Sequence, residues 1–172
     1  TRHEQAAVHM ADAWGRMTGG PGVAMYTTPG FANAIPGLSN ALHSESPLLS
    51  ISGSAPLAEL GRGAMQEIDQ TGMAGPTTKG SWMVTDPRRV PQMISHALRV
   101  AYSGRRGPVH LTIPIDVQER VVSEDERDLY EPVHDGTATR TPGSADSIEA
   151  AISLLLRSSR PLIIAGSAAA YS

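Results

Sequence analysis

The chain has 172 residues, 40% of them apolar, which suits one folded domain or one domain with part of another. Its net charge is −3 and its 14 basic residues are scattered, so it lacks the basic stripe of a nucleic-acid-binding protein. Without cysteine, and without an apolar run long enough to span a bilayer, we expect a soluble, cytoplasmic protein with no membrane partner.

The first predicted elements are a helix, a buried strand and a second helix. Apolar residues recur at helical spacing over residues 4–17, and Gly-Gly-Pro at 19–21 ends this helix. The short apolar run GVAMYT at 22–27 predicts a buried strand. The segment TPGFANAIPGLSNALHS at 28–44 predicts a turn followed by a helix, although Pro36 and Gly37 weaken the helix locally.

Three further strands are predicted before residue 120. They are PLLSISG at 47–53, SWMVTD at 81–86 and GPVHLTIPID at 107–116, with a loop containing one helical turn at 61–70 and an amphipathic helix near 87–101. Strands that alternate with helices and are almost continuously apolar predict an α/β fold, a parallel sheet with helices on both faces. Ligands of such sheets gather at the carboxyl ends of the strands.

The periodic pattern stops after residue 122. Residues 123–144 are charged and rich in Pro, Gly and Thr, which predicts a linker between domains 1–122 and 145–172. After the linker, a helix capped by Ser144 or Asp146 and the strand RPLIIAG at 160–166 predict the start of a second α/β domain.

Six motifs occur in order: RHEQAAVHMADAWGRMTG, TTPGFANAIPGLSNAL, PLLSISG, AMQEIDQ, GPTTKGSW and GPVHLTIPIDVQ. Together they resemble the pyrimidine-binding (PYR) domain of thiamine-diphosphate enzymes of the acetolactate synthase and pyruvate-oxidase-like superfamily, over residues 1–122. Residues 144–166 resemble the start of the family's middle domain. The resemblance implies that a strand-helix unit precedes residue 1 in the domain, and that the diphosphate-binding domain, with its Mg²⁺ ligands, lies outside this sequence.

The resemblance assigns the cofactor-activating role to Glu4. In the family this carboxyl group hydrogen-bonds the pyrimidine nitrogen N1′ of thiamine diphosphate. We expect apolar surroundings to raise the pKa of Glu4 and make it a usable proton donor. The alternative is a residue of the first helical turn that only complements the helix dipole.

The turn TTPGFAN carries the other expected cofactor contacts. By resemblance Thr28, Pro29, Gly30 and Asn33 lie against the pyrimidine ring, Gly30 allowing close approach because it has no Cβ. Phe31 of the same turn is expected to face the substrate. The alternative is an ordinary turn and helix cap.

Gln66 and Lys79 are the remaining substrate residues that the resemblance implies. Gln66 matches a glutamine on the substrate side of the cofactor, and Lys79, the sole lysine, matches one near the mouth of the site. The alternatives are a surface amide in a loop and a solvated lysine. The histidines have no spacing that predicts a metal cluster, and we expect His3 and His110 to be structural.

The predicted function is that of a thiamine-diphosphate-dependent lyase or transferase acting beside a carbonyl of a 2-keto acid, as in acetolactate synthase. TTPGFAN departs from the Ser-Gly-Pro-Gly-Ala-Thr-Asn often found in acetolactate synthases, so benzaldehyde lyase-, oxalyl-CoA decarboxylase- or 2-hydroxyacyl-CoA lyase-like activity, with hydroxy ketone or acyl-CoA substrates, stays open. A non-catalytic α/β domain is a further alternative. The resemblance implies a homodimer or homotetramer with the site between subunits, and an inactive isolated piece.

Overall fold

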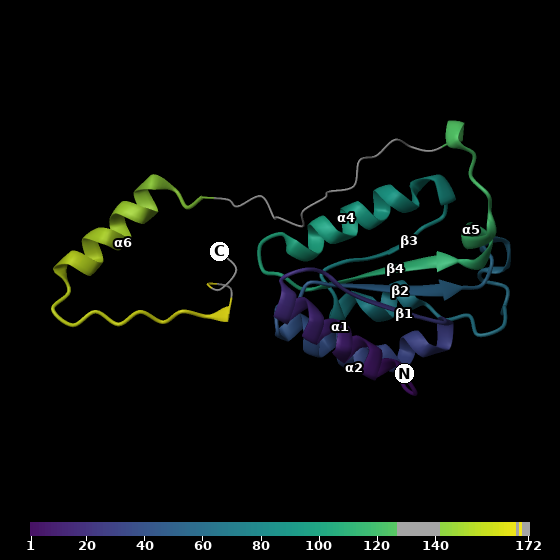
Figure 1. The fold of residues 1–172 in the computed structure, drawn as a ribbon, viewed down its shortest axis with the longest axis horizontal. Coiled ribbons are helices and arrows are strands. Elements are labelled where there is room, and N and C mark those ends of the chain that lie inside the picture. Colours follow the sequence, from purple (N-terminus) through teal and green to yellow (C-terminus); the bar gives the residue numbers. More distant parts are fainter. Residues whose placement is uncertain (127–141, 168, 170–172) are drawn as a thin grey trace. The chain divides into compact units, whose positions relative to one another are not determined.

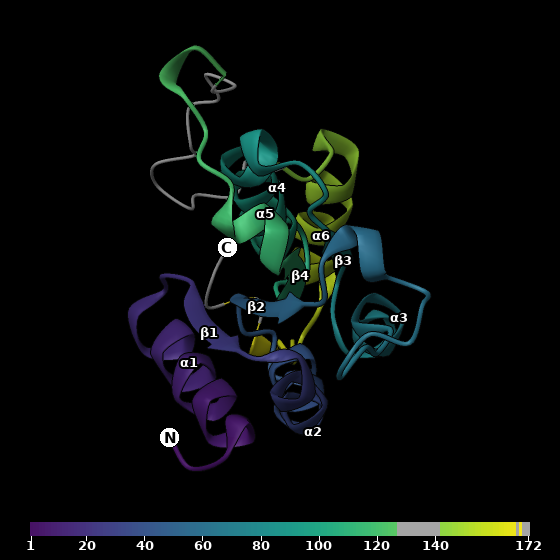
Figure 2. The same ribbon diagram turned by 90° about the vertical axis from the view of Figure 1, so that its right-hand side faces the viewer.

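Four parallel strands build the sheet in the computed structural model, which describes residues 1–126, 142–167 and 169. They are β1 (Gly22–Tyr26), β2 (Leu48–Ser54), β3 (Ser81–Met83) and β4 (Pro108–Pro114), in the order β1-β2-β4-β3. Because all pairs are parallel, the carboxyl ends meet at one edge, which faces the viewer in Figure 2.

Helices cover both faces of this sheet, which confirms the predicted fold class. Helices α1 (Glu4–Thr18) and α2 (Thr28–His43) lie on one face, and α4 (Val90–Tyr102) lies on the other (Figure 1). Helix α3 (Gln70–Ala74), labelled in Figure 2, contributes Ala74 to the apolar cluster of α1 and α2. Short helix α5 (Ile115–Glu119) follows β4. Two clusters of buried apolar side chains fill the layers, one containing Val8, Phe31 and Leu38, the other containing Val109 and Leu111.

Capping residues explain where α1 begins and ends. His3 caps its first turn, since Nδ1 accepts a hydrogen bond from the Gln5 amide at 3.2 Å, which confirms a structural role for His3. Gly19 ends the helix with a left-handed φ of 73°. The predicted second helix is confirmed, because α2 continues through Pro36 to His43. Pro36 lies on the exposed side, and the buried residues on the opposite side hold the helix together.

Helices α1 and α2 approach each other closely. A Cβ built on Gly37 would lie 2.8 Å from the Val8 Cβ, so only glycine fits at this crossing. Nearby, the buried carboxylate of Asp12 accepts hydrogen bonds from Asn40 Nδ2 at 3.0 Å and from Arg16 Nη2 at 3.1 Å. A hydrogen-bonded buried charge therefore joins the two helices.

His110, at the middle of β4, is fully buried and hydrogen-bonded on both ring nitrogens. Nδ1 pairs with Ser50 Oγ at 2.8 Å, and Nε2 pairs with Thr112 Oγ1 at 3.0 Å and Ser52 Oγ at 3.3 Å. Ser50 also bonds the Tyr26 hydroxyl at 2.8 Å. Burial lowers the pKa of His110 to about 3 and raises that of Tyr26 to about 12. The expected structural role of His110 is confirmed.

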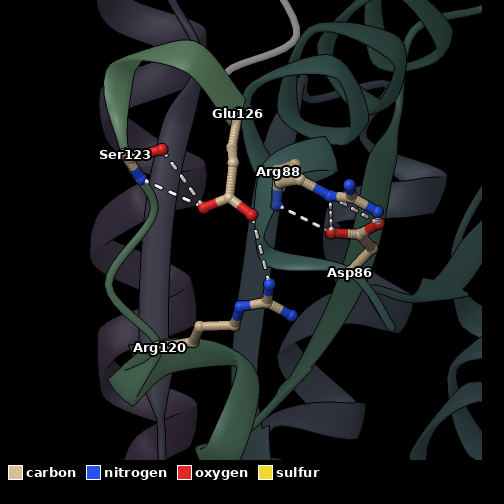
Figure 3. Close-up of polar contacts among 5 residues, drawn as sticks. All are labelled: Asp86, Arg88, Arg120, Ser123 and Glu126. Carbon is tan, nitrogen blue, oxygen red and sulfur yellow. Dashed lines mark hydrogen bonds and ion pairs between the residues drawn. The ribbon is translucent and has the colours of Figure 1, made fainter.

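Charged side chains fasten the segment that leaves the sheet after α5 (Figure 3). Arg120 pairs with Glu126 at 3.4 Å, and Glu126 also accepts hydrogen bonds from Ser123. Beside them Arg88 binds Asp86 and lowers the pKa of that carboxyl to about 2. These exposed pairs contribute little free energy, but they fix the local path of the chain.

The chain divides into two compact units, Thr1–Ala138 and Thr139–Ser172. Most of the predicted linker, residues 127–141, lies outside the described residues. In the second unit, α6 (Ala145–Arg157) begins after Ser144, whose side chain accepts a hydrogen bond from the Ser147 amide. The predicted strand at 160–166 is not formed; a strand needs a hydrogen-bonding partner, and Leu162, Ile163 and Ile164 are exposed. Across the described residues, no helix combines the length and apolarity that a membrane crossing requires.

The first prediction concerns His110 and pH. Its pKa is about 3 in the folded chain and close to 6.5 when unfolded, so only the unfolded state takes up this proton as the pH falls below 6.5. The contribution of His110 to the free energy of unfolding is fully present above pH 6.5 and is lost as the pH falls toward 3. At pH 5 the loss is about 2 kcal/mol. Urea unfolding at pH 7 and pH 5 should show this loss, and it should disappear in His110→Gln. Equal losses in both proteins would contradict a buried neutral imidazole.

The second prediction tests the crossing of α1 and α2. Gly37→Ala should lower the free energy of unfolding by about 1–3 kcal/mol because the new methyl group overlaps Val8, despite the better helix propensity of alanine. Gly75→Ala is the matched control, since its backbone is right-handed and no atom lies within 4 Å of the added Cβ. Urea unfolding measures both variants, and similar small effects would show that the helices can move apart easily.

Candidate functional site

Glu4, Gly30 and Asn33 come together where α1 begins beside the first turn of α2. Asn33 Nδ2 donates a hydrogen bond to Glu4 Oε2 at 3.1 Å. A Cβ built on Gly30 would lie 2.6 Å from Glu4 Oε1, so the carboxylate rests directly over this glycine. Two residues that are 29 positions apart thus share one hydrogen bond at the carboxyl edge of the sheet.

The turn between β1 and α2 holds these groups in place. Thr27 precedes the helix, and its carbonyl accepts a hydrogen bond from the Phe31 amide at 3.0 Å. Pro29 occupies the first turn, where a backbone N–H would have no partner within the helix, so its absence does not destabilise the helix. Thr28 Oγ1 donates to the Gly53 carbonyl near the end of β2 at 3.1 Å. The turn is therefore tied to the neighbouring strand, and Pro29 and Asn33 remain exposed.

The charge of Glu4 differs from the expectation. Its pKa is lowered, not raised, chiefly because the Asn33 amide stabilises the carboxylate. The expected desolvation is weak because the carboxyl group remains accessible to water. In this chain Glu4 is an ionised hydrogen-bond acceptor at neutral pH.

Gln66 lies in the loop between β2 and α3, with an exposed side chain. Its φ of 61° is uncommon for a residue with a side chain. The neighbouring Glu67 carboxylate accepts the Gly61 amide at 2.5 Å and the Ala64 amide at 3.1 Å, which closes the loop on itself. The substrate contact expected of Gln66 stays a prediction.

Lys79 lies away from the Glu4 cluster. Its Nζ donates hydrogen bonds to the carbonyls of Val100 and Ser103 at the C-terminal end of α4, and its own amide bonds Pro108 at the start of β4. These partners place Lys79 at the amino ends of the strands, opposite the edge that carries Glu4. Lys79 satisfies carbonyls at a helix end, which has a negative dipole, and partial burial lowers its pKa.

Phe31 is fully buried, and its ring centroid lies 4.2 Å from that of His110. The ring belongs to the first apolar cluster, with Val8 and Leu38. Contact with a substrate would require this ring to leave the core, so the structure favours a packing role over the substrate contact expected from the sequence.

Gln70 is a residue that sequence reasoning did not select for the site. It is 2% exposed at the start of α3, and its Nε2 donates to the Gly53 carbonyl at 3.0 Å and to the Thr28 carbonyl at 3.4 Å. A single polar residue after an aspartate carries no periodic signal, so only the packing of α3 beneath the turn reveals this contact.

A hollow of about 660 Å³ between β3 and α4, lined by Trp82, His96 and Arg99 among others, contains none of the predicted site residues. In residues 1–126, 142–167 and 169, no three His, Cys, Asp or Glu side chains are grouped in a way that could hold a metal ion. The Glu4 cluster remains the best candidate, since it combines a carboxylate, an amide and a surface without a side chain.

Comparison with known proteins gives consistent relatives. Residues 1–73 match the family model described as thiamine pyrophosphate enzyme, N-terminal TPP binding domain. A probable acetolactate synthase large subunit of Methanocaldococcus jannaschii is 36% identical over 96% of this chain and 28% of its own length. A 2-hydroxyacyl-CoA lyase of Arabidopsis thaliana is 40% identical over 99% of this chain and 30% of its own length.

An oxalyl-CoA decarboxylase of Escherichia coli K12 is 37% identical over 99% of this chain and 31% of its own length. The chain thus spans less than a third of the length of these curated relatives. The family match covers Glu4, the turn at 27–33 and Gln70. Together with the parallel sheet, these similarities place residues 1–73 in the N-terminal domain of the thiamine pyrophosphate enzyme family.

Proposed function

We propose that the Glu4 cluster binds the pyrimidine ring of thiamine diphosphate. The observation that carries this proposal is the position of the Glu4 carboxylate over Gly30, within hydrogen-bond distance of Asn33. The residues fit the ring: Glu4 supplies a group that hydrogen-bonds a ring nitrogen, and Gly30 leaves room that a side chain would fill. Thr28 and Pro29 set the backbone against which the ring lies.

The chemical role proposed for Glu4 is to hold a proton at a ring nitrogen. Thiamine diphosphate, when bound, supplies an electron sink for bonds beside a carbonyl. A bound ring would displace water from Glu4, and desolvation would then raise the pKa that Asn33 lowers in the free chain. Asn33 is the group placed to orient the carboxylate during this change.

The proposed activity is that of a lyase or transferase that forms or cleaves a carbon–carbon bond next to a carbonyl. A 2-keto acid is the first substrate class, as in acetolactate synthases. An acyl-CoA substrate is the second, because TTPGF departs from the acetolactate synthase pattern and because relatives include an acyl-CoA lyase and an acyl-CoA decarboxylase. Gln66, exposed in the loop after β2, is the residue proposed to face either substrate.

We also propose that parts outside this chain complete the site and the sheet. The outer edge of β1 has no strand beside it among the described residues, and Val23 and Met25 of β1 are 52% and 70% exposed. A further strand and helix would cover them. Mg²⁺ and the diphosphate would be held by another domain, contributed by a second subunit of a homodimer or homotetramer.

The third prediction tests Glu4 in the full-length protein. Glu4→Gln keeps the side-chain size but cannot transfer a proton, so cofactor-dependent turnover should fall by about 10²–10⁴. Turnover is measured with pyruvate, a 2-hydroxyacyl-CoA and oxalyl-CoA, which also identifies the substrate class of the unaltered protein.

The control is Glu45→Gln, which removes the charge that pairs with the exposed Arg105 at the amino ends of the strands and should leave turnover unchanged. If Glu4→Gln turns over as fast as the unaltered protein, Glu4 has no part in the chemistry. If no substrate is converted even by the unaltered protein, the non-catalytic alternative is favoured.

The fourth prediction concerns the isolated chain. Residues 1–172 contain the pyrimidine side of the proposed site only, so calorimetric titration with Mg²⁺ and thiamine diphosphate should show weak or unmeasurable binding and no turnover. The full-length protein should bind in the same titration. Tight one-to-one binding by the isolated chain would contradict a site shared with another domain.

A further inference from the structure

Gln70 lies where α3 meets the carboxyl ends of two strands. Helix α3 is held at both ends, because Asp69 accepts the Gly72 amide at 2.9 Å and Ala74 is buried in the first apolar cluster. Between these anchors the side chain of Gln70 is 2% exposed. Its position is therefore fixed by the fold and does not depend on a flexible loop.

The amide of Gln70 joins the end of β2 to the turn that follows β1. Nε2 donates to the Gly53 carbonyl of β2 at 3.0 Å and to the Thr28 carbonyl of the turn at 3.4 Å. Thr28 Oγ1 donates to the same Gly53 carbonyl at 3.1 Å. Two donors converge on one acceptor, and this convergence ties the turn that carries Gly30 to β2.

The orientation of the amide is determined by these contacts. Two carbonyl acceptors require the NH₂ group on their side, because a flipped amide would bring two oxygens together. The Gln70 Oε1 is then buried without a hydrogen-bond partner among the described residues. An unpaired buried carbonyl lowers stability, so an apolar side chain of the same length would serve a core position better. The amide is present for the donor it provides.

We propose that Gln70 is a positioning residue for the pyrimidine side of the cofactor site. By its hydrogen bond to the Thr28 carbonyl, Gln70 fixes the position of Gly30 relative to the Glu4 carboxylate. Small displacements of such a binding surface weaken the binding of a ligand that needs precise placement. This inference rests on the proposed binding of thiamine diphosphate, and it concerns a residue that does not itself touch the ring.

The experiment compares two ligands in the full-length protein. Gln70→Met removes the donor and keeps the side-chain length. Calorimetry with Mg²⁺ measures the Kd of thiamine diphosphate, which needs the pyrimidine surface, and the Kd of inorganic pyrophosphate, which does not. We expect the first Kd to rise about tenfold, which corresponds to about 1.4 kcal/mol. The second should change less than about twofold, and the urea midpoint should shift by no more than about 0.5 M.

Gln118→Met is the matched control. Gln118 Nε2 also donates to a backbone carbonyl at a strand end, that of Ile113 at 2.6 Å, but it does not bond the turn. Its loss should leave both Kd values unchanged. If Gln70→Met does not fold, Gln70→Leu also removes the Nε2 donor and should have the same ligand-selective effect.

The outcomes separate this inference from the proposed function. If the unaltered protein binds pyrophosphate but not thiamine diphosphate, the proposed function fails. If it binds thiamine diphosphate and Gln70→Met binds it equally well, or loses both ligands in parallel with its stability, Gln70 is only a structural residue. A rise in Kd for thiamine diphosphate alone supports the positioning role.

Discussion

The close approach of α1 to α2 is the constraint on which the site depends. Gly30 and Gly37 are at positions i and i+7 of α2, on the same face of the helix, and each meets a residue of α1 where no side chain would fit. Because glycine has no Cβ, Val8 packs directly against Gly37, and the carboxylate of Glu4 lies directly against Gly30. Because one helix pair makes both contacts, the packing of the core and the geometry of the site are determined together.

The parallel sheet supplies the second part of this geometry. Strands β1 and β2 end side by side, so the turn after β1 can be fastened to the Gly53 carbonyl of β2. At the middle of the sheet, His110 and its three hydroxyl partners form a polar network inside the core. Both ring nitrogens of His110 are hydrogen-bonded in this network. Such a network favours one strand register, since a shift would leave buried polar atoms unpaired.

Much of the fold follows from periodicity, while the site depends on contacts between distant residues. The four strands of the sheet, the helix at 4–17 and the helix before β4 were predictable from apolar spacing, and so was the structural His110, but the strand expected at 160–166 is not formed. The hydrogen bonds of Lys79 at the C-terminal end of α4 could not be predicted, because sequence spacing does not tell at which end of a strand a neighbouring side chain points. Pro36 broke no helix, because tertiary packing outweighed its local preference. Gln70 was missed, since its hydrogen bonds to Gly53 and Thr28 exist only once α3 packs against the turn.

The charge of Glu4 shows what the remaining surface must provide. In this chain solvent and Asn33 keep the carboxylate ionised, whereas holding a proton for chemistry near neutral pH requires a higher pKa. Among the described residues the donors near Glu4 favour its charged form, so the change cannot come from them. A higher pKa requires that water be removed from the carboxylate and that an apolar group lie over it. If Glu4 has the role proposed for it, the surface that completes the site would act on its pKa through exclusion of water as much as through contacts of its own, and Glu4 would become a proton donor only when that surface and the ring are both in place.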